Sequence, residues 1–260
     1  SSPVSDAGGN YSDTVDYGWS GTVTPTKAGY TFDPNSITYS NVTSDQTNQD
    51  YTASVLTYTI TGNAGIDGAT MTGLPSSPVS DAGGDYSDTV DYGWSGTVTP
   101  TKAGYSFDPN SRSYSNVTSD QTNQDYTATL LTYTITGNAG IDGATMTGLP
   151  SSPVSDVSGD YSDTVDYGWS GTVTPTKTGY TFDPNSITYS NVTSDQTNQD
   201  YTATLLTYTI TGNAGIDGAT MTGLPGNPVS DAGGDYSDTV DYGWSGTVTP
   251  TKAGYSFDSN

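Results

Sequence analysis

The stretch QDYTATLLTYTITG, residues 124–137, changes its apolar face halfway along its length. Up to Leu130 the apolar residues stand at even positions, and from Leu131 onward they stand at odd positions. Successive side chains of a β-strand point to opposite faces, so one continuous strand cannot present both patterns to one core. The stretch therefore predicts two strands that meet between residues 130 and 131 without a linker.

The stretch belongs to a repeat that fills the whole chain of 260 residues. The period is 75 residues, and residues 57–131 differ from residues 132–206 at six positions, without insertion or deletion. Gly, Thr, Ser, Asp and Tyr dominate, which is strand and turn composition rather than helix composition. A unit of this length and composition predicts an all-β protein built as a tandem array of small β-sandwich domains.

A boundary at each change of face divides the chain into four modules. These are module 1 (1–55, a partial repeat without first strands), module 2 (56–130), module 3 (131–205) and module 4 (206–260, a partial repeat without last strands). No Gly-, Ser- or Pro-rich tether separates them, so adjacent modules are expected to be stiffly coupled. The two partial repeats overlap. We expect a window in a longer chain, and completion by strands of neighbouring subunits is the alternative.

Turn signals divide module 2 into seven expected strands. The predicted strands are Leu56–Gly62, Ala69–Thr72, Pro78–Asp81, Asp85–Asp91, Ser95–Pro100, Tyr105–Ser115 (interrupted at residues 108–110) and Gln124–Leu130.

Strand parity also predicts which side chains form the core. Trp94 shares its face with Val98, which predicts a core anchor, and the same parity places Tyr17 beside Trp19 on the inward face. Ile37 is replaced by Arg112 in module 2, which predicts a solvent-facing position, and Asn41 is predicted to face outward with it.

The charge and the missing residue types exclude several functions. All 28 acidic residues are Asp, only five residues are basic, and the net charge of -23 argues against nucleic acid and anionic membranes as partners. The chain has no His and no Cys, which removes the commonest general base and all thiol chemistry. We expect no enzymatic activity and no resident cofactor.

An Asp-rich hairpin precedes each Trp and is the candidate metal site. In module 2 it holds Asp81, Asp85 and Asp88, and calcium prefers several converging oxygen ligands. Hairpin-turn and surface roles for these acids are the favoured alternative, because Asp85 and Asp88 have opposite parity. Glycoside hydrolysis by a pair of Asp residues is disfavoured, because four copies in separate small domains do not indicate a cleft.

Four Asn-x-Ser/Thr sequons are candidates for covalent glycans. Three follow the repeat and one stands alone near the start: Asn41, Asn116, Asn191 and Asn10. A turn-capping role for these Asn residues is the favoured alternative, because the motif is short.

The segments VSDAGGDYSDTV, GWSGTVTPTKAGYTFDP and YSNVTSDQTNQDYTA together resemble tandem repeats of bacterial surface proteins. The resemblance is to the transthyretin-like or carboxypeptidase-regulatory-like β-sandwiches, which are cousins of Cna B-type and bacterial Ig-like domains. It implies a seven-stranded Greek-key sandwich, an extracellular or cell-surface location and no catalysis. Some Cna B-type modules carry a Lys–Asn isopeptide bond assisted by an acid, usually Glu; this chain has no Glu and its Lys102 lies in a turn, so we expect no such crosslink.

Two classes of function remain. The favoured one is a non-enzymatic structural protein that forms an extracellular filament, fibre or stalk, with neighbouring repeats or further copies as partners. The alternative is an adhesin or a carbohydrate- or calcium-binding module that acts by avidity. Tyr17, Trp19 and Tyr30 could stack on a sugar, although their parity favours core packing.

Overall fold

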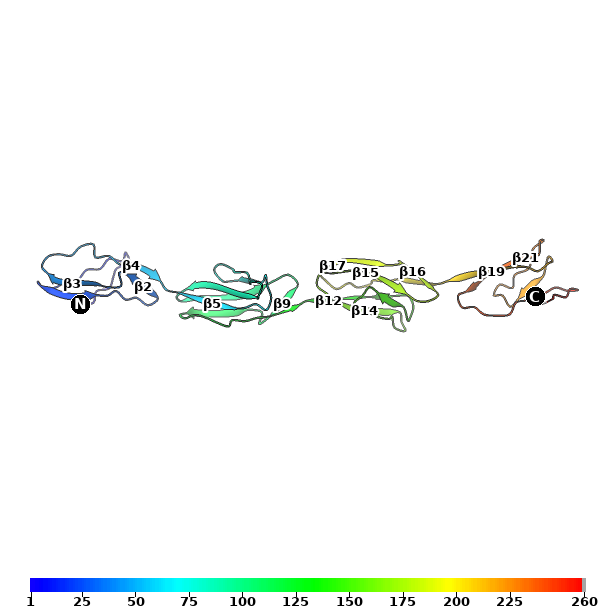
Figure 1. Cartoon of the computed structure of the whole chain (residues 1–260), viewed down its shortest axis with the longest axis horizontal. Helices are drawn as coiled ribbons and strands as arrows, with labels where there is room; N and C mark the ends of the chain where they lie inside the picture. Colours follow the sequence, from blue (N-terminus) through cyan, green and yellow to red (C-terminus); the bar gives the residue numbers. More distant parts are fainter. Residues whose placement is uncertain (259–260) are drawn as a thin grey trace. The chain divides into compact units, whose positions relative to one another are not determined.

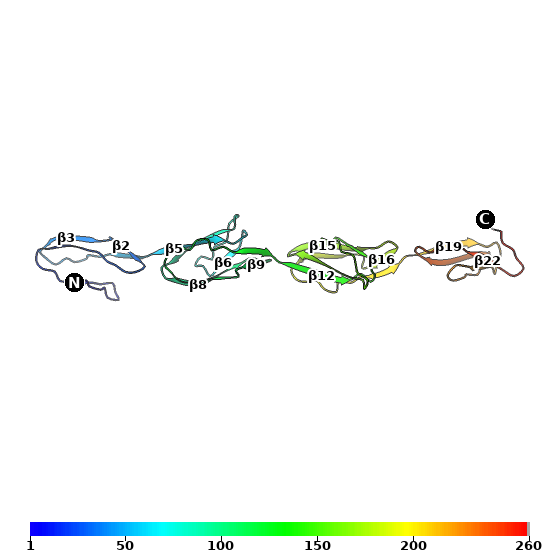
Figure 2. The ribbon, with the colours of Figure 1, turned by 90° about the horizontal axis from the view of Figure 1, so that it is seen from below.

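The computed structural model describes residues 1–258, which form strands and turns and no helix (Figures 1 and 2). The chain divides into two compact units, Ser1–Thr129 and Leu130–Asn260. Within the described part, no helix is long and apolar enough to cross a membrane. The predicted all-β class is confirmed.

Modules 2 and 3 contain the same seven strands. In module 2 these are β5 (Thr57–Asn63), β6 (Thr70–Thr72), β7 (Asp85–Asp91), β8 (Trp94–Thr101), β9 (Tyr105–Asp108), β10 (Arg112–Val117) and β11 (Thr127–Leu130). In module 3 they are β12 (Thr132–Asn138), β13 (Thr145–Thr147), β14 (Asp160–Asp166), β15 (Trp169–Thr176), β16 (Tyr180–Asp183), β17 (Ile187–Val192) and β18 (Thr202–Leu205).

Modules 1 and 4 each show part of this set. Module 1 contains β1 (Trp19–Val23), β2 (Tyr30–Asp33), β3 (Ile37–Val42) and β4 (Thr52–Val55). Module 4 contains β19 (Thr207–Asn213), β20 (Thr220–Thr222), β21 (Asp235–Asp241) and β22 (Thr249–Thr251).

Module 2 is a sandwich of antiparallel sheets. Strands β10, β8 and β6 form one sheet in that order, β5 pairs with β7, and β9 pairs with β11. The core draws Ile60 and Val90 from the pair β5–β7, and Met71 and Val98 from the three-stranded sheet. All four side chains are almost completely buried, which is how two sheets exclude water between their inner faces.

The Trp position was correctly placed. Trp94 is half-buried and packs against the core cluster that contains Val98. Its ring lies 5.8 Å from that of Tyr114 and covers Gly96, whose missing side chain leaves room for the indole. Trp94 is therefore a packing residue of module 2, as its copy Trp169 is of module 3.

Two predicted strands differ from the structure. The expected strand Tyr105–Ser115 is interrupted near the predicted residues 108–110, but its two halves belong to different sheets, because β9 pairs with β11 and β10 pairs with β8. The expected strand Pro78–Asp81 is reduced to an isolated bridge between Val79 and Thr70.

Two parity predictions were wrong. Tyr17 is 85% exposed and lies in the turn before β1, outside the alternation of the strand, and its copy Tyr92 in the same turn before β8 is 36% exposed. Arg112 is half-buried rather than solvent-facing: its guanidinium lies 5.4 Å from the Tyr126 ring and donates to the carbonyl of Asp125. The long stem lets Arg112 occupy an inward position and still bring its charge to the edge.

Candidate functional site

The first strand of each complete module is covered on one edge by a polar segment. We call residues 119–126 and their copies 44–51 and 194–201 the closing segment. In module 2, Thr61 donates its backbone N–H to Gln121 O at 2.8 Å, and Gln121 donates back to Thr59 O at 2.8 Å. Further along, Tyr126 N–H donates to Asn63 O at 2.8 Å. The segment therefore runs parallel to β5 and satisfies backbone groups that would otherwise form an open sheet edge.

Side chains strengthen this attachment. The backbone N–H groups of Thr59 and Asn63 each donate to a carboxylate of the segment, Asp120 and Asp125, at 2.8 Å. The hydroxyl of Tyr86 reaches the carbonyl of Gln124 at 2.5 Å. Asp120 and Asp125 are therefore hydrogen-bond acceptors for the backbone N–H groups of β5.

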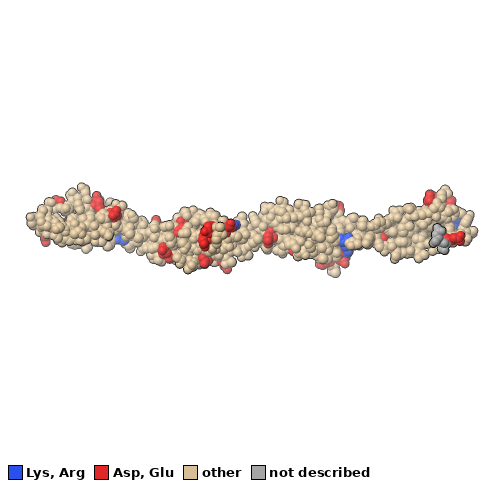
Figure 3. Space-filling model, viewed as in Figure 1, with Lys and Arg blue, Asp and Glu red and all other residues tan. Residues whose placement is uncertain are grey.

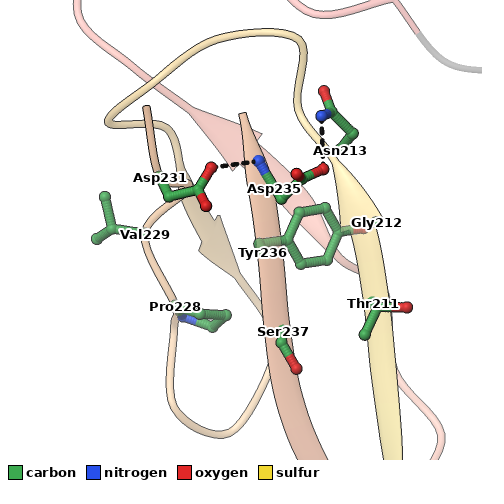
Figure 4. Close-up of a pocket in the computed structure, with 9 residues that line it drawn as sticks. All are labelled: Thr211, Gly212, Asn213, Pro228, Val229, Asp231, Asp235, Tyr236 and Ser237. Atoms are coloured by element: carbon green, nitrogen blue, oxygen red, sulfur yellow. Dashed lines mark hydrogen bonds between the residues drawn. The ribbon is translucent and has the colours of Figure 1, made fainter. Parts of the chain in front are cut away.

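The corresponding edge of β19 in module 4 is bordered by a hollow of about 580 Å³ (Figure 4). Its lining includes Gly212 and Asn213 of β19 and Tyr236 of β21. No described residue between 1 and 258 donates to or accepts from β19 in the way that the closing segment does on β5 and β12. Two of its lining residues, Gly212 and Tyr236, correspond to Gly62 and Tyr86, which the closing segment contacts through Gln124 in module 2.

Adjacent modules within a unit meet at a tight joint. We call the set Gly29, Leu56 and Tyr92, with its copy Gly179, Leu206 and Tyr242, the joint. Leu56 lies between β4 and β5; its N–H donates to Gly29 O and its carbonyl accepts from Tyr92 N–H, both at 2.8 Å. One residue therefore bonds to module 1 on one side and to module 2 on the other.

The aromatic ring of Tyr92 completes the joint. It covers Gly29, where an added Cβ would lie 2.4 Å from the ring, and it packs 6.4 Å from the ring of Tyr58. Tyr242 covers Gly179 in the same way. Sequence parity assigned this Tyr to the core, so its role was missed. The signal that could have identified it is that each repeat carries both this Tyr and the Gly of the Lys-Ala/Thr-Gly turn, and a joint brings the Tyr of one module onto the Gly of the module before it.

The acidic hairpin is organised by backbone amides. Asp81 Oδ1 accepts N–H groups from Gly83 at 2.8 Å and Asp85 at 2.9 Å, and Asp85 accepts from the side-chain amide of Asn63 at 2.7 Å. Asp231 and Asp235 repeat these contacts in module 4 (Figure 4). The acids therefore hold the turn together, as Asx turns do.

Asp88 lies apart from that turn. Its carboxylate accepts the N–H groups of Ser76 at 2.8 Å and Thr89 at 2.9 Å. No group of three acidic side chains within the described residues is arranged to hold a metal ion. The structure thus brings together Asp81 and Asp85, but not Asp88, and calcium binding stays a prediction without a geometric site.

The repeated sequons lie at a β-bulge. The pairing of β8 with β10 shifts register between Tyr114 and Val117, and Asn116 there adopts a φ of 51° and points to solvent. Asn41 and Asn191 have the same φ and exposure. The outward direction was predicted correctly but for the wrong reason, because Tyr114 faces the core and only the bulge turns Asn116 outward.

The remaining charges form local pairs on a surface where acidic side chains are dispersed (Figure 3). Lys102 Nζ lies 3.0 Å from Asp67 Oδ1, and Lys177 Nζ lies 2.9 Å from Asp142 Oδ1, so each Lys forms an ion pair with an Asp of its own module. Each Lys also lies over the ring of the Tyr three residues later, at the end of the same turn.

Comparison with known proteins supports the fold alone. No family model matches the chain, and no curated protein matches its sequence. A solved structure described as the Bacillus anthracis TIE protein is similar, with a TM-score of 0.57 and 11% identity, over 86% of this chain and 51% of that chain. The chain therefore spans about half of that protein, and the likeness is one of β-rich architecture.

Buried tyrosines make stability depend on alkaline pH. Burial raises the pKa of Tyr126, Tyr189 and Tyr201 to about 12, and it also raises the pKa of Tyr86 and Tyr161. In the unfolded chain a Tyr ionises near pH 10, so the unfolded state loses its proton first. The stabilisation is complete below about pH 10 and is lost as the pH rises towards about 12.

We therefore expect the urea midpoint of modules 2 and 3 to fall steeply between about pH 10 and pH 12. Circular dichroism at a series of pH values measures this. Tyr201→Phe removes one of the titrating phenols and should flatten the fall. A midpoint that stays constant through this window contradicts the prediction.

Proposed function

We propose that this protein is a non-enzymatic structural array, in which stiffly joined β-sandwich modules set the length of an extracellular filament, fibre or cell-surface stalk. The observation that carries the proposal is the joint, in which Leu56 alone connects two modules and is hydrogen-bonded to both. A protein that only displayed binding domains would tolerate flexible tethers between them. A load-bearing or length-setting array requires joints that resist bending.

Three contacts at the joint resist bending for different reasons. The two backbone bonds of Leu56 fix the direction of the chain, and the Tyr92 ring on Gly29 blocks a hinge movement towards that side. The same contacts recur at Leu206 in the second unit. The joint contacts recur in the second unit, whereas no copy of the repeat carries a distinctive loop. This favours a role that depends on how the modules are joined.

The surface suits a spacer. Its acidic residues are spread among the modules, and the hairpin acids are already bonded to backbone amides, so a high net negative charge keeps the surface soluble and non-adhesive. The finer family assignment is part of the proposal: we infer modules of the transthyretin-like or Cna B-type kind, displayed outside the cell, with neighbouring repeats or further copies of the chain as partners.

The joint can be tested by inserting Gly-Gly-Ser-Gly between Val55 and Leu56. In the unmodified chain, ¹⁵N relaxation should give one rotational correlation time for modules 1 and 2. The insertion separates the two hydrogen bonds of Leu56, so module 1 should tumble faster than module 2.

The matched control carries the same four residues between Ala82 and Gly83, at the exposed tip of the hairpin in module 2. It should leave the common correlation time unchanged. Independent tumbling of modules 1 and 2 in the unmodified chain would overturn the proposed function.

A further inference from the structure

Asn116 is held in an unusual position by its own module. Its backbone N–H donates to Ser95 Oγ at 2.9 Å, and its φ of 51° lies in the left-handed region. Ser20 and Ser170 hold Asn41 and Asn191 in the same way, both at 2.8 Å. The bulge is therefore a built feature of the repeat, and each copy turns one Asn side chain away from the sheet.

The side-chain amide of Asn116 is free to react. It is exposed, and no described residue forms a hydrogen bond with it. The hydroxyl-bearing Thr118 two positions later is exposed as well, which completes an accessible Asn-x-Thr sequon.

Two other exposed Asn residues lack this combination. Asn10 is in a sequon, but its side-chain amide donates to Asp6 and, with its backbone N–H, lowers the pKa of that carboxyl. Asn123 has a φ of 56° and is exposed, but it is followed by Gln124 and Asp125 and is in no sequon. Asn10 and Asn123 therefore serve as controls: the first has the sequon without a free side-chain amide, and the second is exposed without a sequon.

The bulge lies on a strand whose outer edge is open. β10 ends the sheet β10-β8-β6 and has β8 as its one strand partner among the described residues, and β3 and β17 are end strands in their own sheets. An open edge invites pairing with other chains unless charge, a bulge or a cover protects it. Arg112 and the bulge protect β10 in part, and a bulky group on Asn116 would cover the remainder.

We propose that Asn41, Asn116 and Asn191 are attachment sites for N-linked glycans, one on the edge strand of each of modules 1, 2 and 3. In the transfer, a bond forms between Asn116 Nδ2 and the anomeric carbon of a glycosyl diphosphate donor. The bond from that carbon to the diphosphate oxygen breaks, the diphosphate leaves with the electron pair, and a base of the transferase takes one amide proton. The glycan shields the edge strand and spaces neighbouring chains.

Peptide mapping of the chain from its native source tests the proposal directly. Mass spectrometry should find a hexose- or N-acetylhexosamine-containing mass increment on Asn41, Asn116 and Asn191, and none on Asn123. Bare Asn at the three bulges in the native protein overturns the proposal. Enzymatic removal of the glycans should raise light scattering at high protein concentration, because the edge strands become open.

A second experiment tests whether the folded bulge itself presents the acceptor. The purified, folded 260-residue chain is incubated with a nucleotide sugar and a soluble N-glycosyltransferase. Thr118→Ala should abolish transfer to Asn116 and leave Asn41 and Asn191 modified, whereas Thr118→Ser should retain it. Equal modification of Asn10 and Asn116 would overturn the role assigned to the bulge.

Ser95 is the positioning residue in this scheme. Ser95→Ala removes the acceptor for the Asn116 N–H and should slow transfer to Asn116 in the folded chain, while transfer to the urea-unfolded chain stays as fast as in the parent. An unchanged rate in the folded chain would exclude Ser95 from this role.

Discussion

Replacing Gly137 with Ala is expected to release the closing segment of module 3 and to lower its free energy of unfolding by about 4 kcal/mol. A Cβ at this position would lie 2.2 Å from the carbonyl oxygen of Gln199 and 2.5 Å from its carbonyl carbon. Both are backbone atoms, so the clash is relieved only if the segment moves away from β12.

The cost follows from what the segment contributes. Gln196 and Thr134 bond through their backbones at 2.8 Å, and Tyr201 N–H donates to Asn138 O at 2.8 Å. The Tyr201 side chain, which is 4% exposed, would become accessible to water. Loss of several buried hydrogen bonds together with one aromatic side chain accounts for an effect of this size.

Gly212→Ala in module 4 is the matched control. It occupies the equivalent position, but the three atoms nearest to a Cβ there all belong to the Tyr236 side chain, at 2.5–2.9 Å, and none is a backbone atom. We expect a destabilisation below about 1 kcal/mol. Hydrogen exchange of the β12 amides reports the stability of module 3, and that of the β19 amides reports the stability of module 4. Equal destabilisation by the two substitutions would contradict the role of the closing segment.

The sequence predicted the sandwich wherever alternation was uninterrupted. Parity placed Trp94 and Val98 inward, and the structure agrees. It failed at Tyr17 and Arg112, because a turn interrupts the alternation at the first and a long side chain at the second reaches the edge from an inward position. Side-chain period alone carries no information about such interruptions.

The closing segment was not recognised as a paired segment for a related reason. Its residues 119–125 are polar throughout and have no apolar alternation, since the backbone and two Asp side chains make its contacts. A signal was nevertheless present: Gly62 stands inside the strand TYTITGN, and a Gly within a strand often marks the close approach of another backbone. In the structure Gly62 faces the carbonyl of Gln124.

The candidate sites were predictable only as residue types. The sequence allows Asp81, Asp85 and Asp88 to be metal ligands or turn residues, and only the structure assigns backbone N–H donors to Asp81 and Asp88 and the side-chain amide of Asn63 to Asp85. The outward direction of Asn116 depends on a bulge, which adds one residue without any sequence signature at that position. Long-range hydrogen bonds decide both questions.

A synthetic peptide with the sequence of residues 187–205 is expected to bind module 4 along β19 and fill the hollow beside Tyr236. In module 3 this segment supplies Tyr189 and Val192 to the core, and they are 7% and 4% exposed. In module 4 the residues Trp244 to Val248 form no strand, whereas their counterparts in β15 do, because β17 pairs with β15. The peptide carries both the closing segment that bonds to β12 and the strand β17 that pairs with β15 in module 3.

Binding should protect the amides of Thr209, Thr211 and Asn213 from hydrogen exchange by about tenfold or more at saturating peptide, which corresponds to about 1.4 kcal/mol. The amides of β12 should not change, because their edge already carries the closing segment. Gly212→Ala supplies the decisive control: its Cβ would meet the carbonyl of the bound peptide as a Cβ at Gly137 would meet that of Gln199. Peptide binding that is equally strong to the parent and to Gly212→Ala would show that the peptide does not occupy the closing position, since only that position places a backbone carbonyl against this glycine.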